Sequence, residues 1–170
     1  MKSIIDKYKV TKIFHFTDEE NIISIKKHGG LLSIKLQEEK GVKPTKPGGN
    51  KWSHDADKLN GVDKYVHLCF ANHHPMQYRA TQDERIKNTV WLEIDPSVLL
   101  FPTTMFTSNV ANKSGVNVIN GKQAASEIDF EALYCYLDWK ESENKERRAK
   151  AEKSEILVLD FIPLELIRNI

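Results

Sequence analysis

The sequence predicts an α+β fold in a single domain that spans residues 1–170. Short apolar runs at 65–70 and 155–161 predict strands, and helical stretches lie between such runs. The short strands and tight turns favour an α+β fold over repeated βαβ units. A chain of 170 residues is long enough for one hydrophobic core and too short for two comfortable ones. Its 40% hydrophobic and 29% charged residues are typical of a globular protein.

The first expected strand covers residues 12–17. Its alternation places Phe14 and Phe16 on one face and His15 and Thr17 on the other. We expect the two phenylalanines to face the core. A histidine and a hydroxyl side by side on the second face indicate either an edge strand with one wet face or the floor of a site.

A helix over residues 18–28 follows this strand. Thr17 is a suitable N-cap, and Glu20 lies three residues further on, as a capping box requires. Gly29 and Gly30 then end the helix, since a left-handed C-terminal turn favours glycine.

A long stretch over residues 34–63 shows no clear pattern. It contains "KPTKPGGNKW", whose proline and glycine content predicts irregular structure. A loop of this length is usually functional or disordered. The elements expected beyond it are a strand at 65–70, a helix at 74–87, a strand at 89–95, short strands and turns at 103–120, a helical or irregular stretch at 125–139, a highly charged stretch at 141–154 and a strand at 155–161. In strand 65–70, alternation places Tyr65, His67 and Cys69 on one face and Val66, Leu68 and Phe70 on the other.

Charge and cysteine content limit the possible cellular location and partners of the protein. The formal net charge is only +1, so a nucleic-acid site would have to be a local patch. Cys69 and Cys135 form no CxxC pair, which indicates a reducing compartment. The first ten residues carry charges throughout their apolar stretch, so we expect neither a signal peptide nor a membrane anchor. These features predict a cytoplasmic protein without a membrane partner.

Several common chemistries lack their motifs. The sequence has no GxGxxG, no phosphate-binding GxxxxGK[ST] and no GxSxG nucleophile elbow. Its histidines and cysteines lack the two tight ligand pairs of a structural zinc site, so we expect no metal.

Glu155 stands at the head of the strand "EILVLDF". One interpretation is a solvated carboxylate where a strand emerges. The other is a carboxylate held by a packed strand, which suits stabilising positive charge on a sugar ring during glycosyl transfer. His15 has the same two interpretations, a strand-edge histidine bonded to backbone or part of a site.

Three segments, which follow one another in this order along the chain, decide between the two interpretations of Glu155 and His15. They are "FHFTDEENIISIKKHGGLLS", "YVHLCFANHHPMQY" and "KSEILVLDFIP", and the set they belong to runs from about residue 12 to 168. This set resembles the DarT toxins, which are ADP-ribosyltransferases that act on single-stranded DNA. The resemblance implies the ADP-ribosyltransferase fold, a split and mostly antiparallel β core with flanking helices that holds NAD in a cleft.

The resemblance also implies roles for individual residues. Glu155 matches the catalytic glutamate, which steadies the oxocarbenium-like ribose while a nucleobase attacks C1′. The residues implied to bind NAD are His15, Phe16, Thr17, Ser24, Leu32 and Tyr65, with the 34–63 stretch folded over the cofactor. The charged residues 141–154, with Trp139 before them, would lead into Glu155 as the substrate-recognition loop.

Side chains near that loop suit single-stranded nucleic acid. Trp139, Tyr134 and Tyr136 offer surfaces on which bases can stack. Lys145, Arg147, Arg148 and Lys150 offer phosphate contacts. The other interpretation of this basic run is a solvated helix face with Glu–Lys pairs.

The sequence departs from the thymidine-modifying members of the family in one respect. Those members carry an arginine in the loop after the first helix, whereas residues 34–63 contain none. Lys51 lies nearest that position by spacing and His54 is close to it, so these two are the candidates to replace it. The target base, thymine or guanine, therefore stays open, as do an RNA or protein target, plain NAD hydrolysis and a non-catalytic nucleic-acid-binding domain. The resemblance further implies a cognate antitoxin that removes ADP-ribose.

Overall fold

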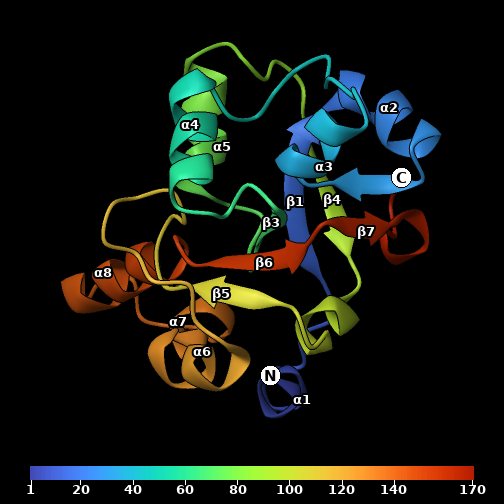
Figure 1. Cartoon of the computed structure of the whole chain (residues 1–170). Helices are drawn as coiled ribbons and strands as arrows, with labels where there is room; N and C mark the ends of the chain where they lie inside the picture. Colours follow the sequence, from blue (N-terminus) through green and yellow to red (C-terminus); the bar gives the residue numbers. More distant parts are fainter.

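Two antiparallel β-sheets form the centre of the computed structural model, which describes all residues 1–170 (Figure 1). The larger sheet has the order β4-β1-β3-β6-β5, formed by β4 (Thr89–Ile94), β1 (Ile13–Asp18), β3 (Tyr65–Cys69), β6 (Glu155–Leu159) and β5 (Met105–Thr107). The smaller sheet pairs β2 (Gly30–Leu32) with β7 (Phe161–Pro163). This arrangement confirms the predicted α+β class with a split antiparallel core.

The larger sheet is split between β1 and β3. Strand β1 pairs with β4 at six positions and β3 pairs with β6 at five, but β1 and β3 pair only at Phe14 and Cys69. Beyond that pair, the His15 side chain replaces the missing backbone ladder, with its Nδ1 2.9 Å from the His67 carbonyl oxygen. The sheet therefore opens next to His15, and its interior becomes available to a ligand.

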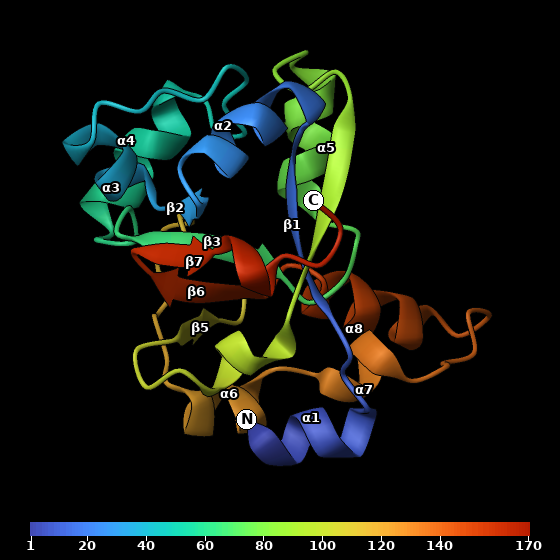
Figure 2. The ribbon, with the colours of Figure 1, turned by 90° about the vertical axis from the view of Figure 1, so that its right-hand side faces the viewer.

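Helices cover both sides of the sheets (Figure 2). On one side lie α2 (Ile22–Lys27), α3 (Ile34–Glu39) and α4 (Lys51–Leu59), and on the other α1 (Lys2–Tyr8), α6 (Gly121–Glu127) and α7 (Phe130–Tyr134). The remaining helices are α5 (Pro75–Gln82) and α8 (Ser142–Ala151). Short 3-10 turns cover Glu19–Asn21, Pro96–Leu100 and Leu164–Leu166. None of the helices combines the length and the apolar composition needed to cross a bilayer.

The main hydrophobic core fills the side of the sheet that carries α1, α6 and α7. Val66, Leu68 and Phe70 are buried in it, which confirms the predicted core face of β3. The Phe70 ring packs edge-on against Phe130 at 5.4 Å between centroids, and Phe106 stacks on it from β5. The other face of β3, with Tyr65 and His67, is thereby turned away from the core.

The predicted core face of β1 was wrong. Ile13 is fully buried in the core, but Phe14 is only half-buried and packs edge-on against Trp91 of β4. Phe16 also contacts Trp91, at 5.7 Å between ring centroids. The reason is the split in the sheet, because the core ends at Ile13 and the phenylalanines pack against the neighbouring strand instead.

The first helix begins differently from the prediction. Asp18, not Thr17, is the N-cap, and its Oδ1 accepts the Glu20 N–H at 3.0 Å. Thr17 instead remains in β1, where its hydroxyl accepts a hydrogen bond from Asn21. The helix end is as predicted, since Gly29 has φ +77°. Gly30 is needed for another reason, because a Cβ there would lie 2.0 Å from the Ile162 carbonyl oxygen across the β2–β7 pair.

The 34–63 stretch contains two helices that the sequence did not reveal. Ser33 caps α3, and Asn50 caps α4 by accepting the Ser53 N–H at 2.8 Å. In α4 the apolar residues Trp52, Ala56 and Leu59 share one side of the helix, but this side is not the buried one, because α4 turns its polar residues Ser53 and Asp57 to the cleft and leaves Trp52 and Leu59 exposed. Only the connection between α3 and α4, which holds the Pro–Gly segment, is irregular as predicted.

Candidate active site

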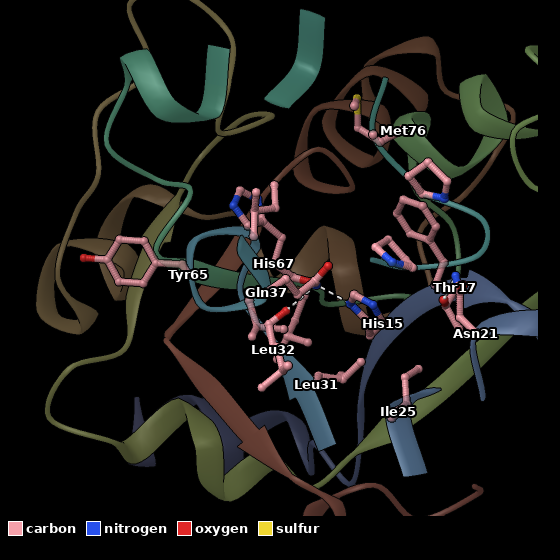
Figure 3. A pocket seen from close by; sticks show the side chains of 18 of the residues that line it. His15, Thr17, Asn21, Ile25, Leu31, Leu32, Gln37, Tyr65, His67 and Met76 are labelled. Atoms are coloured by element: carbon pink, nitrogen blue, oxygen red, sulfur yellow. Dashed lines mark hydrogen bonds between the residues drawn. The ribbon is translucent and has the colours of Figure 1, made fainter. Parts of the chain in front are cut away.

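A cleft opens where β1 and β3 separate, between these strands and the segment 21–57 that covers them (Figure 3). Figure 3 shows His15, Thr17, Tyr65 and His67 around this cleft. The sequence-predicted residues that line it are His15, Phe16, Thr17, Ser24, Leu32, His54, Tyr65 and Glu155. The structure therefore brings together residues from four strands and two helices that the sequence analysis assigned to one site.

His15 presents an acceptor to the cleft. The His67 carbonyl can only accept a hydrogen bond, so Nδ1 of His15 must carry the proton. Burial lowers the pKa of His15, which keeps the imidazole neutral at pH 7. Its Nε2 then has a free lone pair and no intramolecular partner, and a ligand hydroxyl can donate to it.

Asn21 fastens the connection between α3 and α4 over the cleft. Its Nδ2 donates to the Lys46 carbonyl at 2.7 Å, and its Oδ1 accepts the Lys46 N–H at 3.0 Å. The same Nδ2 lies 3.1 Å from the Thr17 hydroxyl oxygen, which leaves the Thr17 O–H free to donate. Asn21 thus sets the position of the covering segment and the orientation of Thr17.

Glu155 is buried at the first position of β6, with 4% of its surface exposed. It lies in register with Cys69 on one side and Thr107 on the other. Its Oε2 accepts from His67 Nδ1 at 2.7 Å, and its Oε1 accepts the Ala111 N–H at 3.3 Å. The solvated interpretation of this carboxylate was therefore wrong.

The contact between Glu155 and His67 is an ion pair. Nε2 of His67 lies 3.2 Å from the Val62 carbonyl oxygen, so both ring nitrogens face acceptors and both carry protons. Burial alone would lower the pKa of His67, but the hydrogen bond and charge of Glu155 outweigh it and raise that pKa to about 9. Burial raises the pKa of Glu155, but the hydrogen bond and charge of His67 bring it below its usual value. The catalytic candidate is thus held ionised and oriented.

A second histidine approaches the same carboxylate. His74 is the N-cap of α5, and its Nδ1 accepts the Met76 N–H, so the proton lies on Nε2. This Nε2 is 3.6 Å from Glu155 Oε1 and has no hydrogen-bond partner. Burial lowers the pKa of His74, so its ring is neutral at pH 7. His74 is a buried donor that a ligand or a small movement of Glu155 can satisfy.

Comparison with known proteins agrees with this geometry. A sequence description of the family "ssDNA thymidine ADP-ribosyltransferase, DarT" matches residues 14–170. The chain belongs to the DarT family. It is therefore an NAD-dependent ADP-ribosyltransferase of the class that modifies single-stranded DNA. No sequence among the curated proteins matches it.

Solved DarT structures share its fold. DarT of Thermus sp. 2.9 in complex with ADP-ribosylated ssDNA is 18% identical, with a TM-score of 0.66 over 94% of this chain and 79% of the other. The complex of the same protein with NAD+ is 17% identical, with a TM-score of 0.61 over 94% and 80%. Thermosipho africanus DarTG in complex with ADP-ribose is 15% identical, with a TM-score of 0.67 over 92% of this chain and 42% of the other. These similarities confirm the predicted ADP-ribosyltransferase fold.

The two candidates for the missing DarT arginine differ in position. His54 lines the cleft beside Gly49, and burial lowers its pKa. Lys51 is exposed and lies outside the cleft lining, contrary to its expected place at the reacting base. The helical period explains this, because α4 turns its residues 53, 54 and 57 towards the cleft and residue 51 towards solvent.

The two arginines expected to bind phosphate have intramolecular partners in this DarT chain. Arg147 forms a bidentate pair with Asp129 at 2.8 and 3.1 Å and a further contact with Glu131. Arg148 donates to two carbonyl groups at the C-terminal end of α7 and to Glu152. These contacts occupy two of the three guanidinium nitrogens of each arginine, so both arginines fasten α8 to α7.

The other residues predicted for nucleic acid remain accessible. Lys145 and Lys150 are exposed on α8 and form no ion pair, and Trp139 is 53% exposed between α7 and α8. Tyr136 is exposed beside it, whereas Tyr134 packs against Tyr8 and Phe130 and offers no stacking surface. None of these side chains lines the cleft.

The partners of Glu155 could not be identified from the sequence. Alternation placed His67 opposite the core, but only the pairing of β3 with β6 shows that it reaches a residue 88 positions away. His74 had a usable signal, since a polar residue before Pro75 at a helix start is typical of an N-cap. No group of three or more His, Cys, Asp or Glu side chains is arranged to hold a metal ion.

Proposed function

We propose that the cleft between β1 and β3 binds NAD and that Glu155 assists transfer of its ADP-ribose to a base of single-stranded DNA. The observation that carries this proposal is the buried Glu155–His67 ion pair at the point where the sheet splits. A carboxylate held ionised at the edge of an open cleft is suited to stabilising a cationic sugar.

The remaining cleft residues suit the parts of the dinucleotide. His15 Nε2 accepts a hydrogen bond from a ribose hydroxyl, and the Thr17 hydroxyl donates one. Phe16 and Tyr65 provide aromatic walls for the nicotinamide side. Ser24 and Leu32 line the cleft near the covering segment, where they contact the rest of the cofactor. No metal takes part in this proposal.

The reaction begins with weakening of the bond between nicotinamide and C1′. Positive charge then develops on the ribose, and Glu155 lies in surroundings of low dielectric constant, where its charge is weakly screened. His67 keeps this carboxylate ionised and limits its rotation, so the charge is in place before the substrate arrives. Attack by a base on C1′ completes the transfer.

Single-stranded DNA fits the reaction because a stacked and paired base cannot reach C1′ inside a cleft. Exposed Trp139 and Tyr136 offer stacking surfaces for bases near the target, and Lys145 and Lys150 offer phosphate contacts. The description of the family names thymidine, and we propose thymine as the target, with guanine as the alternative.

A cognate antitoxin is the expected partner. One structural relative is a DarTG protein solved with ADP-ribose, and this chain covers 42% of it. We propose that the partner of this chain removes ADP-ribose from DNA, and that both proteins act in the cytoplasm, where single-stranded DNA arises.

Incubation with labelled NAD and separate samples of DNA, RNA and protein tests the proposal. Label should appear on single-stranded DNA, and Glu155→Gln should lower transfer by about 10²–10³-fold in a protein that still folds, with a melting temperature lowered by loss of the ion pair with His67. The exposed Glu143 provides the matched control, Glu143→Gln, which should retain full transfer. Label on RNA or protein, free ADP-ribose alone, or no turnover would each contradict the proposed substrate. Full activity of Glu155→Gln would contradict the assigned role.

A further inference from the structure

Helix α4 has one polar face buried against the cleft. Ser53 and Asp57 are its only buried residues, and both line the cleft. Their spacing of four residues places them on the same side of the helix, one turn apart. The Ser53 hydroxyl is occupied by Asn112, which donates to it at 2.7 Å. Asp57 is therefore the acidic group that this face presents to the cleft.

The Asp57 carboxylate is incompletely satisfied. The residue is 6% exposed, yet its Oδ1 has no hydrogen-bond partner. An unpaired buried acceptor loses its hydration without a replacement, so such groups are rare in folded proteins unless they have a functional use. The terminal torsion of an aspartate is soft, so a small rotation turns this oxygen to the cavity. A ligand with an N–H or O–H group would satisfy it.

Burial makes Asp57 a stronger base than Glu155, whose charge is stabilised by His67. Burial raises the pKa of Asp57 to about 6. His67 of β3 and a hydrogen bond from Asn112 act to lower it, while Glu155 of β6 and Asp63 before β3 act to raise it. His54 on the same helix is neutral at pH 7, since burial lowers its pKa. Glu155 is committed to His67 and has a pKa below its usual value. An acceptor with a pKa near the working pH is the effective one in proton transfer.

The transfer reaction requires such an acceptor. When a base nitrogen that bears hydrogen attacks C1′, the new N–C1′ bond forms as the bond from C1′ to nicotinamide breaks. The bonding electrons leave with nicotinamide, which becomes neutral, and the attacking nitrogen must lose its proton. We infer that the Asp57 carboxylate accepts this proton and releases it to solvent after transfer, so that Asp57 is a second catalytic residue. This inference rests on the proposed function of the cleft.

Asp57→Asn tests the inference, because it keeps the size and removes the basic oxygen. Transfer to a single-stranded oligonucleotide should fall by about 10²–10⁴-fold, while the dissociation constant of NAD changes by less than about threefold. In the wild type, log kcat should fall below pH 6 with a slope of one, and this limb should be absent in Asp57→Asn. Asp55→Asn alters an exposed carboxylate of the same helix and should retain full transfer and the acid limb.

Two further variants keep the test decisive. Asp57→Glu retains a carboxylate and should keep the acid limb with a reduced rate, even where Asp57→Asn is poorly folded. The inference would be overturned if the dependence of log kcat on pH were the same in Asp57→Asn as in the wild type. It would also be overturned if His54→Gln, and not Asp57→Asn, removed the acid limb. Equal loss of melting temperature, NAD affinity and transfer in both Asp57 variants would also overturn it, since Asp57 would then be structural. Absence of transfer by the wild type would overturn the proposed function itself, with this inference as a consequence.

Discussion

His67→Gln should remove a pH-dependent part of the stability. The variant keeps a donor near Glu155 but loses the imidazolium charge at 2.7 Å from its carboxylate. The raised pKa of His67, from 6.5 to about 9, corresponds to about 3 kcal/mol at about 1.36 kcal/mol per pH unit. We therefore expect the free energy of unfolding at pH 6 to fall by about 3 kcal/mol in the variant.

The direction of the pKa shift of His67 determines the pH range over which the ion pair stabilises the protein. A histidine whose pKa is raised by folding contributes its full stabilisation below the unfolded pKa of 6.5, and this stabilisation is lost as pH rises through about 9. His15, His54 and His74 have lowered pKa values, so their stabilisation is lost as pH falls below 6.5. The window between pH 6.5 and 9 thus isolates His67 among the buried histidines.

Urea denaturation at pH 6, 7.5 and 9 measures the effect. The free energy of unfolding of His67→Gln should lie about 3 kcal/mol below that of the wild type at pH 6, and this difference should shrink to near zero at pH 9. The other buried histidines are present in both proteins, so their contribution cancels in the difference. His73→Gln is the matched control, because His73 is 71% exposed and its loss should cost under about 0.5 kcal/mol. Parallel profiles for the wild type and His67→Gln would refute the ion pair.

Four other predictions concern ligand binding and the role of Arg147. His15→Ala should weaken NAD binding by about 1–3 kcal/mol in calorimetry, since a ribose hydroxyl loses its acceptor, and unchanged affinity would place NAD elsewhere. Replacement of Lys145 and Lys150 by alanine should reduce the log–log salt slope of single-strand binding by about 1.4, measured by fluorescence anisotropy in the absence of NAD. Arg147→Ala should instead lower the melting temperature and leave that slope unchanged, because its guanidinium is held by carboxylates, and the reverse pattern would restore Arg147 as a phosphate contact. Trp139→Ala should cost about 1–3 kcal/mol of DNA affinity if a base stacks on it, with no change in NAD affinity.

Local patterns in the sequence were sufficient for the elements that carry the site. Alternation in 65–70 separated the core residues Val66, Leu68 and Phe70 from the cleft side of β3, because a strand with one buried face has a period of two. The same reasoning failed for Phe14, since the sheet splits beside it and the core ends one residue earlier. The alternation of residues along a strand does not show where the neighbouring strand diverges from it.

Contacts between distant segments could not be predicted in this way. The Glu155–His67 pair depends on the register of β3 and β6, and the ties of Arg147 depend on how α8 packs on α7. The apolar residues of α4 lie on a side of the helix that is exposed, so the burial of Asp57 follows only from the position of α4 over the cleft. Tertiary packing determines ion pairs of this kind, and the residues adjacent in the sequence do not predict them.

The central claim is that the cleft at Glu155 transfers ADP-ribose to DNA. Mass spectrometry of a single-stranded oligonucleotide, after incubation with NAD and the protein, tests it most directly. The oligonucleotide should gain the mass of one ADP-ribosyl group with the wild type and with Glu143→Gln, and not with Glu155→Gln. Fragmentation should place the added group on a base. An unmodified oligonucleotide with the wild type, or equal modification by Glu155→Gln, would contradict the account.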